Sequence, residues 1–453
     1  MNAVLVFSVL SVLLVVGKIL RVKIPLLQRL YLPSAVVGGL LGLLIVTVCN
    51  SIRPNLIPES LTGTLRQFPG FLINVIFATL FLGVAVPRLK SLAGLVLPQL
   101  TLAQIVVWGQ YVIGIGVAGF LLVPSFHVHP AFGNLLELGF EGGHGTVAGM
   151  AEAFRGRGWE DAIPLGYTVA TAGMIFGIVI GMGLVHWAYR RGHVKTVRPF
   201  EERSLEERQG IQPHDARPSA GHQTVFADSV DSLAWHLAIV GLAVLIGYCV
   251  LLGLQRAELA LNPNAANPLF KGFPLFPLCM LGGVALQGLA RLLKVDLLIS
   301  RGQMQRISGA ALDYLALSAV ATIQLSVVAA NWIPLTLMMV AGMAWTVASV
   351  LFLSPRLFQQ DWFERGIAEF GQATGVTATG LLLLRTVDPE NKTAAAASFA
   401  GKQLINEPVM GVWVAVAFAL VFKYGWQPVF YICSAVLLVW MIVAFILIRS
   451  RKR

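Results

Sequence analysis

Long stretches without a charged side chain constrain this chain more than any other feature. Asp, Glu, Lys and Arg are all absent from residues 2–17, 30–52, 67–87, 91–136, 162–189, 232–255, 272–290, 314–355 and 424–448. A helix needs roughly 20 apolar residues to cross a bilayer core, because each residue rises about 1.5 Å and all backbone polar groups must be paired within the helix. Most of these stretches are that long. They predict an all-α membrane protein.

The number of spans follows from the breaks inside these stretches. Pro124 and Pro130 end a helix within 91–136, and the segment 331–334, which contains Pro334, divides 314–355 into two. Residues 394–422 form a further, less apolar span. The sequence therefore predicts eleven spans.

Composition excludes other classes of protein. Hydrophobic residues make up 57% of the chain and charged residues only 12%, whereas soluble chains carry about a quarter charged residues. The net charge of +11 comes from basic residues that flank apolar runs, so no nucleic-acid partner is expected. The four cysteines lie in separate apolar stretches, and no His, Cys, Asp and Glu spacing suggests a metal centre. We expect no enzyme activity and no resident metal.

The basic residues also predict the orientation. Lys18, Arg21, Lys23 and Arg29 follow the first apolar segment, which is therefore a retained span with its N-terminus outside. With this orientation, 25 Lys and Arg residues fall in cytoplasmic loops and the tail, and 7 fall outside. Such a bias is typical of cytoplasmic loops. It predicts a multi-pass protein of the cell (inner) membrane with a cytoplasmic C-terminus.

The order of segments indicates an internal repeat. Pro33 precedes Gly38-Gly39, and Pro277 precedes Gly282-Gly283, at the same spacing in the second span of each half. Each half continues with two spans, a glycine-rich stretch and one more span. Five crossings is an odd number, so the second half enters the membrane from the opposite side, as in inverted-topology repeats. The predicted domains are a first repeat, a flexible cytoplasmic linker, a second repeat, and an extra span with a basic tail, at residues 1–189, 190–230, 231–422 and 423–453.

The two glycine-rich stretches, residues 139–149 and 369–380, are too rich in Gly and Thr for ordinary helix interiors. They predict re-entrant hairpins at about 131–155 and 363–385, which meet near the membrane midplane. Irregular backbone is tolerated there only where it is buried or lines a cavity. Half-helix starts can hold a carboxylate, and unwound carbonyls can hold a small cation. Close helix packing is the alternative explanation of the same glycines.

Polar residues inside these segments are candidates for function. Lys402, Asn406 and Glu407 are placed on one face of the last span of the second repeat, and ionisable groups within a span are functional hypotheses by default. A structural Lys402–Glu407 ion pair is the alternative. His144 is either a packing residue or a donor to a substrate.

These residues resemble a known family, the sodium/glutamate symporters. Residues 142–146, with the sequence Gly-Gly-His-Gly-Thr, match the first signature hairpin of that family, and Phe370-Gly371 with Thr377-Ala378 is similar to the second. The resemblance covers roughly residues 1–422. It implies sodium-coupled uptake of glutamate by an elevator-type mechanism, and a homodimer in which a scaffold flanks moving domains that contain the hairpins.

Residues and resemblance together lead to a specific hypothesis for the site. The substrate, glutamate or a related small carboxylate, would be held by Gly142, Gly143, Gly145, Thr374 and Gly375, with His144, Thr146 and Thr377 as side-chain donors. The coupling ion, Na⁺, would be held by backbone carbonyls and by side chains from the set Glu141, Glu369, Gln372, Asn406 and Glu407.

Two departures from the family pattern affect this hypothesis. Glu141 stands where the family usually has Ser, and Ala368-Glu369 stands where it has Cys-Gly. Extra carboxylates disfavour an acidic substrate unless they are protonated or paired with a cation. A proton-coupled transporter of another solute and a passive channel or facilitator therefore remain as alternatives.

Overall fold

The computed structural model describes residues 2–53, 56–84, 89–194, 202, 204–213, 215, 217, 219–261, 270 and 273–450, without the side chains of 89–93. The regular secondary structure of these residues is helical throughout. Nine of the described helices are long and apolar enough to cross a membrane. The chain is an all-α membrane protein with many spans.

The helices before the linker follow the predicted order. They are α1 (Asn2–Lys23), α2 (Pro25–Arg29), α3 (Ser34–Ile52), α4 (Glu59–Thr79), α5 (Leu89–Val117), η1 (Ala118–Leu122), α6 (Val123–Phe126), η2 (Phe132–Asn134), α7 (Leu135–Phe140), α8 (Gly143–Gly156) and α9 (Ala162–Arg190). The fifth helix continues through η1 and α6 without a gap. It ends at Phe126 because His127 is left-handed, at φ 53°. The helix therefore continues past Pro124, which we had predicted to end it.

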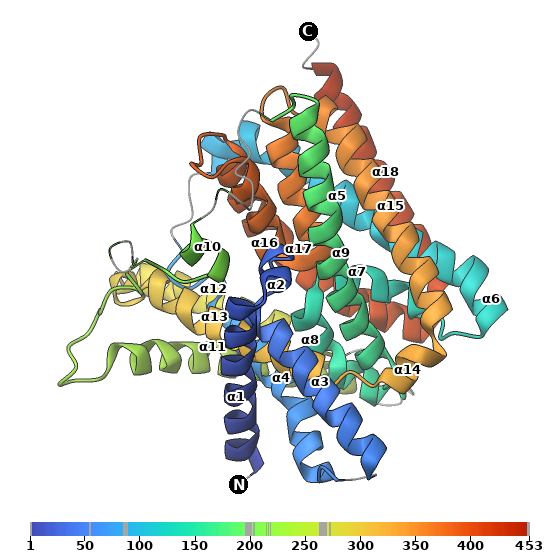
Figure 1. Cartoon of the computed structure of the whole chain (residues 1–453). Helices are drawn as coiled ribbons and strands as arrows, with labels where there is room; N and C mark the ends of the chain where they lie inside the picture. Colours follow the sequence, from blue (N-terminus) through green and yellow to red (C-terminus); the bar gives the residue numbers. More distant parts are fainter. Residues whose placement is uncertain are drawn as a thin grey trace.

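The remaining helices lie in the linker and after it. They are α10 (Leu205–Gln209) in the linker, then α11 (Ser232–Leu261), α12 (Phe276–Leu292), η5 (Asp296–Leu298), α13 (Arg301–Ala321), α14 (Leu325–Ala330), α15 (Trp332–Leu357), α16 (Trp362–Val387), α17 (Ala395–Tyr424) and α18 (Trp426–Ser450). In Figure 1 the N-terminus lies at one end of the molecule and the C-terminus at the other.

Some predicted boundaries were wrong. The eighth span was expected to begin at residue 314, but α13 begins at Arg301. Arg301 is partly buried, and its Nη1 donates to the carbonyls of Thr79, Leu80 and Leu82 at the end of α4, at 3.0, 3.0 and 3.2 Å. A search for charge-free stretches misses the start of this helix because it contains an arginine. The helix tolerates this charge because backbone oxygens at the end of α4 bind it. Other predicted loop or tail residues, Arg88, Lys195, Arg198, Arg203 and 451–453, lie outside the described part of the chain.

Glycines set the closest helix contacts, and they do so at matching places in the two halves. A Cβ at Gly38 would lie 2.5 Å from the carbonyl oxygen of Leu13 in α1, and one at Gly282 would overlap the carbonyl oxygen of Ala243 in α11. The next glycine of each pair packs across the halves: Gly39 contacts α13 and Gly283 contacts α4. Helices α4 and α13 also pack on each other. These backbones approach closely because the glycines have no side chain.

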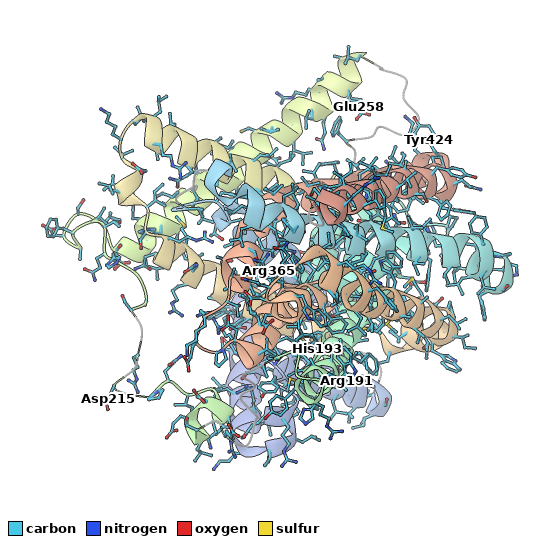
Figure 2. All side chains as sticks on the ribbon, turned by 90° about the horizontal axis from the view of Figure 1, so that it is seen from above. Arg191, His193, Asp215, Glu258, Arg365 and Tyr424 are labelled. Atoms are coloured by element: carbon cyan, nitrogen blue, oxygen red, sulfur yellow. The ribbon has the colours of Figure 1, made fainter. Side chains whose placement is uncertain are left out.

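Parts of the predicted flexible linker are anchored. Lys18 Nζ of α1 donates to the carbonyls of Gln209 and Gly210, at 2.9 and 2.8 Å. Thr224 Oγ1 donates to the Leu298 carbonyl at 2.9 Å. Between these two anchored stretches, Asp215 lies at the periphery of the view in Figure 2, while Arg365 lies near its middle. The anchored stretches thus rest on α1 and on the segment that precedes α13.

Candidate functional site

The first glycine-rich stretch breaks a helix. Helix α7 ends at Phe140, and α8 begins at Gly143, whose φ of +66° is left-handed. A residue with a side chain is disfavoured in this conformation. The amide of Gly142 donates back to the Glu137 carbonyl at 3.1 Å, which closes the end of α7. The break therefore depends on glycine at position 143.

The second stretch also breaks, although α16 is continuous in its overall bounds. Gly375 and Val376 have non-helical backbone angles, and Val376 has a φ of 61°. The two limbs then fold back on each other, because a Cβ at Gly371 would lie 2.6 Å from Cα of Gly380. In a straight helix, nine residues would separate these positions by about 13.5 Å. Helix α16 is therefore a helical hairpin with its tip at residues 375–376.

The two breaks meet. A Cβ at Gly143 would overlap Cγ1 of Val376, so the tip of the second hairpin rests on the start of α8. Helix α9 allows this approach with two glycines: a Cβ at Gly173 would lie 2.6 Å from the Thr374 carbonyl oxygen, and one at Gly177 would overlap the Thr374 hydroxyl. Two segments more than 200 residues apart thus share one contact, between the buried Gly143 and the half-buried Val376.

The side chains expected to donate to a substrate are engaged within the protein. His144 Nε2 is 2.9 Å from Thr171 Oγ1, and that hydroxyl donates to the Tyr167 carbonyl at 2.8 Å, so His144 is the donor of the pair. Thr146 Oγ1 donates to the Gly142 carbonyl at 2.8 Å. Gly145 is packed against Ile73 of α4. The packing role of His144 is therefore the one visible here, and Gly142 is bonded through both its amide and its carbonyl.

The second tip is likewise tied to its neighbours. Thr374 Oγ1 donates to the Phe370 carbonyl at 2.8 Å. Thr377 Oγ1 lies 3.3 Å from Glu407 Oε1 and accepts a bond of 2.7 Å from Gln403 Nε2. The same Gln403 nitrogen lies 3.0 Å from Gln372 Oε1 and 2.8 Å from Glu407 Oε1. Gln403, which sequence reasoning missed, thus joins α17 to both limbs of the hairpin.

A fully buried ion pair holds the first limb of α16. Lys402 Nζ lies 2.9 Å from Glu369 Oε1, and both side chains are 0% exposed. The second oxygen of Glu369 accepts a bond of 3.0 Å from Gln99 Nε2 of α5. The extra acid of this hairpin is therefore compensated by a cation, as burial of a charge requires.

This pair corrects the alternative in which Lys402 binds Glu407. Residues five apart on a helix point about 140° away from each other, so Lys402 and Glu407 do not share a face. Asn406, four residues after Lys402, does share its face, and both are buried, whereas Glu407 is partly exposed. Glu407 instead faces the second limb of the hairpin through Thr377.

Asn406 connects Glu141, at the end of α7, to α5. Its Nδ2 donates to Glu141 Oε1 at 2.9 Å, and its Oδ1 accepts from Gln104 Nε2 at 2.7 Å. Gln104 Oε1 in turn accepts a bond of 2.8 Å from Trp108 Nε1. Glu141 and Asn406, both predicted coupling-ion residues, are therefore direct partners.

Sequence reasoning missed the glutamines of α5. Gln99 bonds Glu369, Gln104 bonds Asn406, and Gln110 Nε2 donates to the Ala373 carbonyl at 2.7 Å just before the second tip. A signal was present, since three amides lie within one otherwise apolar stretch. The spacing of these amides does not indicate which distant segments they bond, so the sequence did not single them out.

The site is acidic as a whole. Around the tips, α7 supplies Glu137 and Glu141, α16 supplies Glu369, and α17 supplies Glu407 and the amine of Lys402. Four carboxylates against one amine favour a bound cation in a medium of low dielectric. Among the described residues, however, no group of three or more His, Cys, Asp or Glu side chains is arranged to hold a metal ion. A sodium ion here would need backbone carbonyls and amide oxygens as ligands.

Comparison with known proteins identifies relatives of this chain. The model of a family described as sodium/glutamate symporter matches residues 1–387. A sodium/glutamate symporter from Haemophilus influenzae is 23% identical over 423 residues, which cover 90% of this chain and 95% of that protein.

Proposed function

Since the chain belongs to the sodium/glutamate symporter family, we propose that it couples the uptake of glutamate or a related small carboxylate to a sodium gradient. The protein is a transporter and not an enzyme. Its substrate would bind at the tips of α7–α8 and α16, where the broken backbones of the two segments meet.

The contact between Gly143 and Val376 carries this proposal. It brings the start of α8 and the broken part of α16 together inside a bundle of apolar helices. A helix start presents unpaired N–H groups, which suit a substrate carboxylate. Backbone carbonyls at the Gly375–Val376 break suit a sodium ion, which would replace the Thr379 hydroxyl that now donates to the Gly375 carbonyl. Both kinds of backbone group are needed for symport of an anion with a cation.

The predicted residues take roles consistent with their contacts. Backbone of Gly142, Gly143, Gly145, Thr374 and Gly375 would bind the substrate, and His144, Thr146 and Thr377 would become donors only if their present bonds are exchanged. Gln372, Asn406 and Glu407 would contribute oxygens to sodium. Glu141 would tune the charge beside Asn406, while Glu369 would serve chiefly to hold Lys402.

We also propose two inverted repeats, residues 1–189 and 231–422, joined by the linker 190–230 and followed by an extra span in 423–453. The matching contacts of Gly38 with Gly282, and of Gly39 with Gly283, support this division. Both glycine-rich segments would be re-entrant, with the N-terminus outside and the C-terminus in the cytoplasm. The positions of the termini at opposite ends of the molecule support their placement on opposite sides of the membrane (Figure 1).

An elevator-type mechanism needs one body that moves and one that stays. The polar network joins α5, α7, α16 and α17 into one unit. The glycine contacts join α1, α3, α4, α11, α12 and α13 into another. We propose that the first unit carries the site across the membrane, and that the second forms the scaffold of a homodimer.

Uptake into proteoliposomes tests this function directly. Labelled glutamate should accumulate when an inward sodium gradient is imposed at equal pH, and should not accumulate when potassium replaces sodium. Unlabelled small dicarboxylates and amino acids, added in excess, would then define the range of substrates by competition. Symport would be refuted if glutamate only reached equal concentrations on the two sides of the membrane, at the same rate in sodium and in potassium. That result would identify a passive facilitator.

A further inference from the structure

Two adjoining pockets lie between α1, α3, α4 and α13, at the end of the molecule where the N-terminus lies (Figure 1). The first, of about 410 Å³, is bordered by the last two turns of α3, the first two turns of α4 and the residues where α13 ends. The second, of about 110 Å³, reaches between α3 and α4 to α1. The two pockets adjoin because they share the lining residues Val46, Thr62, Leu65 and Ala321.

The larger of these, the polar pocket, has the chemistry to bind an anion. Arg66 of α4 is the one charged side chain among the described residues that line it. Arg66 is exposed, so its guanidinium is open to a ligand. Asn50 and Gln324 add amide groups, which can donate hydrogen bonds to the same anion. The fork of N–H donors on a guanidinium matches the oxygens of a phosphate, so a phosphate group fits this pocket best.

The smaller one, the apolar pocket, opens to the hydrocarbon of the membrane. Thr62, which it shares with the polar pocket, is the one polar side chain among the described residues that line it. Val6 and Leu13 of α1 form buried parts of its lining and are 2% and 8% exposed. Val9 and Ile45 also line it but are 41% and 44% exposed. In a membrane-spanning helix, such exposed apolar side chains face acyl chains.

The order of the two pockets along the helices matches the order of groups in a phospholipid. Asn50 borders only the polar pocket and lies two residues before the end of α3. Gly42 borders only the apolar pocket and lies eight residues earlier, which places it about 12 Å deeper. In α1, the lining residues from Val6 to Leu13 extend the apolar pocket over about 10 Å. Polar groups therefore lie at the helix ends, and apolar groups lie toward the middle of the spans.

A hollow at the opposite ends of these helices is covered by the chain itself. It has about 370 Å³, lies between the end of α12, the start of α13 and the residues after α4, and is bordered by His222 and Thr224 of the linker. The His222 amide donates to Ser300 Oγ at 3.3 Å, and Thr224 Oγ1 donates to the Leu298 carbonyl at 2.9 Å. In the proposed repeat, α3 and α4 correspond to α12 and α13, so this hollow is the counterpart of the polar pocket. No linker residue in the described ranges borders the polar pocket, which is therefore open to a ligand.

We propose that the two pockets together bind one phospholipid with an anionic headgroup. Its phosphate lies against the Arg66 guanidinium, and one acyl chain lies along α1 in the apolar pocket. A soluble anion would fill the polar pocket alone, whereas a lipid joins a charged group and a hydrocarbon chain in the order that the pockets require. With the N-terminus outside, as proposed, this lipid belongs to the outer leaflet. The site is separate from the hairpin tips, so the inference does not depend on the proposed transport.

Native mass spectrometry of the full-length protein in detergent tests the headgroup. The probes are phosphatidylglycerol and phosphatidylcholine with the same two oleoyl chains, of which the first is anionic and the second has no net charge. The wild type should bind a first phosphatidylglycerol about fivefold more tightly than phosphatidylcholine, since one basic residue near a membrane surface contributes about 1 kcal/mol. Arg66→Gln should abolish this preference. Arg53→Gln is the matched control, because Arg53 is exposed just after α3 and borders neither pocket.

A second pair of variants tests the acyl chain. Ile45→Trp fills the apolar pocket and should weaken the binding of phosphatidylglycerol. Leu44→Trp should leave it unchanged, because Leu44 is 59% exposed and borders neither pocket. Glycerol 3-phosphate carries the phosphate without the chains and should not displace the lipid. Displacement by this soluble anion, or equal binding by the two tryptophan variants, would overturn the inference.

Photo-crosslinking of the wild type in proteoliposomes locates the lipid without a variant. A phosphatidylglycerol with a diazirine midway along one chain should label residues 6–13 of α1 more strongly than the corresponding phosphatidylcholine does, because general contact with the bilayer is the same for both. Equal labelling by the two lipids would refute the proposal. Absence of labelling, together with dimers that Ile45→Trp dissociates and Leu44→Trp does not, would refute it in favour of a second copy of the chain on this surface.

Discussion

Gly143 and Val376 are in contact, and both have a left-handed backbone, with φ of +66° and +61°. One residue begins α8 and the other forms the tip of the α16 hairpin. A β-branched residue at positive φ is a genuine outlier, and such strain, of order 1–3 kcal/mol, tends to lie at functional sites. The contact thus joins two local irregularities, and it is the feature on which the transport proposal depends.

Replacing Gly143 with Ala should impair transport. The new methyl group would overlap Val376 and would sit on a residue at positive φ, so the tips must separate. We expect sodium-driven uptake to fall by about tenfold or more, which corresponds to about 1.4 kcal/mol. Gly156→Ala is the matched control, because a Cβ there meets no atom within 4 Å. Equal uptake by the two variants would show that the tip contact is dispensable.

Loss of Lys402 should destabilise the protein. Lys402→Met leaves Glu369 buried without its cation, and breaking such a pair costs about 3–5 kcal/mol. The double variant Lys402→Met with Glu369→Gln should recover much of this loss, because the uncompensated charge is gone. Thermal unfolding in detergent measures both, with Lys423→Met, at an exposed lysine of α17, as the control. A double variant no more stable than Lys402→Met would argue against a charge effect.

Matching glycines should have matching effects on stability. Gly38→Ala and Gly282→Ala each place a methyl group against a backbone carbonyl, of Leu13 and Ala243, which cannot rotate away. Overpacking of this kind typically costs about 1–3 kcal/mol, and we expect similar losses in both variants. Gly288→Ala in α12 meets open space and should be neutral or stabilising. Denaturant titration in detergent measures these losses of stability. A large difference between Gly38→Ala and Gly282→Ala would weaken the proposed repeat symmetry.

The turn after α16 should depend on pH through Asp388. Partial burial raises the pKa of this carboxyl, but bonds from the Thr393 hydroxyl and from the amides of Thr393 and Lys392, at 2.6, 3.0 and 2.8 Å, lower it overall below the ordinary value of 3.8. The ionised carboxylate of Asp388 therefore stabilises the fold at pH values above its ordinary pKa of 3.8. This contribution is lost as the pH falls through the lowered pKa of the folded protein.

Asp388→Asn should remove that contribution. At neutral pH we expect the variant to lose about 1 kcal/mol of unfolding free energy, since it replaces charge-assisted hydrogen bonds with neutral ones. The difference from the wild type should shrink in acid. Unfolding measured over a pH series tests this, with Asp228→Asn at an exposed position as the control. A difference that stays constant down to strongly acidic pH would contradict the assigned role.

Charge-free and glycine-rich stretches of the sequence predicted the long helices and the places where two of them break. Charge-free stretches of sufficient length correspond to long helices, since lipid requires backbone groups to be paired within each helix. The glycine-rich stretches marked both breaks: glycine permits the positive φ at Gly143, whereas at the second break the positive φ falls on Val376. Boundaries failed where a charge is buried: α13 starts 13 residues before residue 314, at an Arg301 that caps the end of α4.

The partners of the buried polar groups could not be predicted in this way. Glu369 binds Lys402 across 33 positions, and Gln104 binds Asn406 across 302. The sequence by itself determined how much of the chain lies in membrane helices and where those helices break, because hydropathy and backbone freedom are properties of neighbouring residues. Only the tertiary structure decided which acid is paired with Lys402 and which glutamine is bonded to Asn406, because these pairings depend on how separate helices face one another.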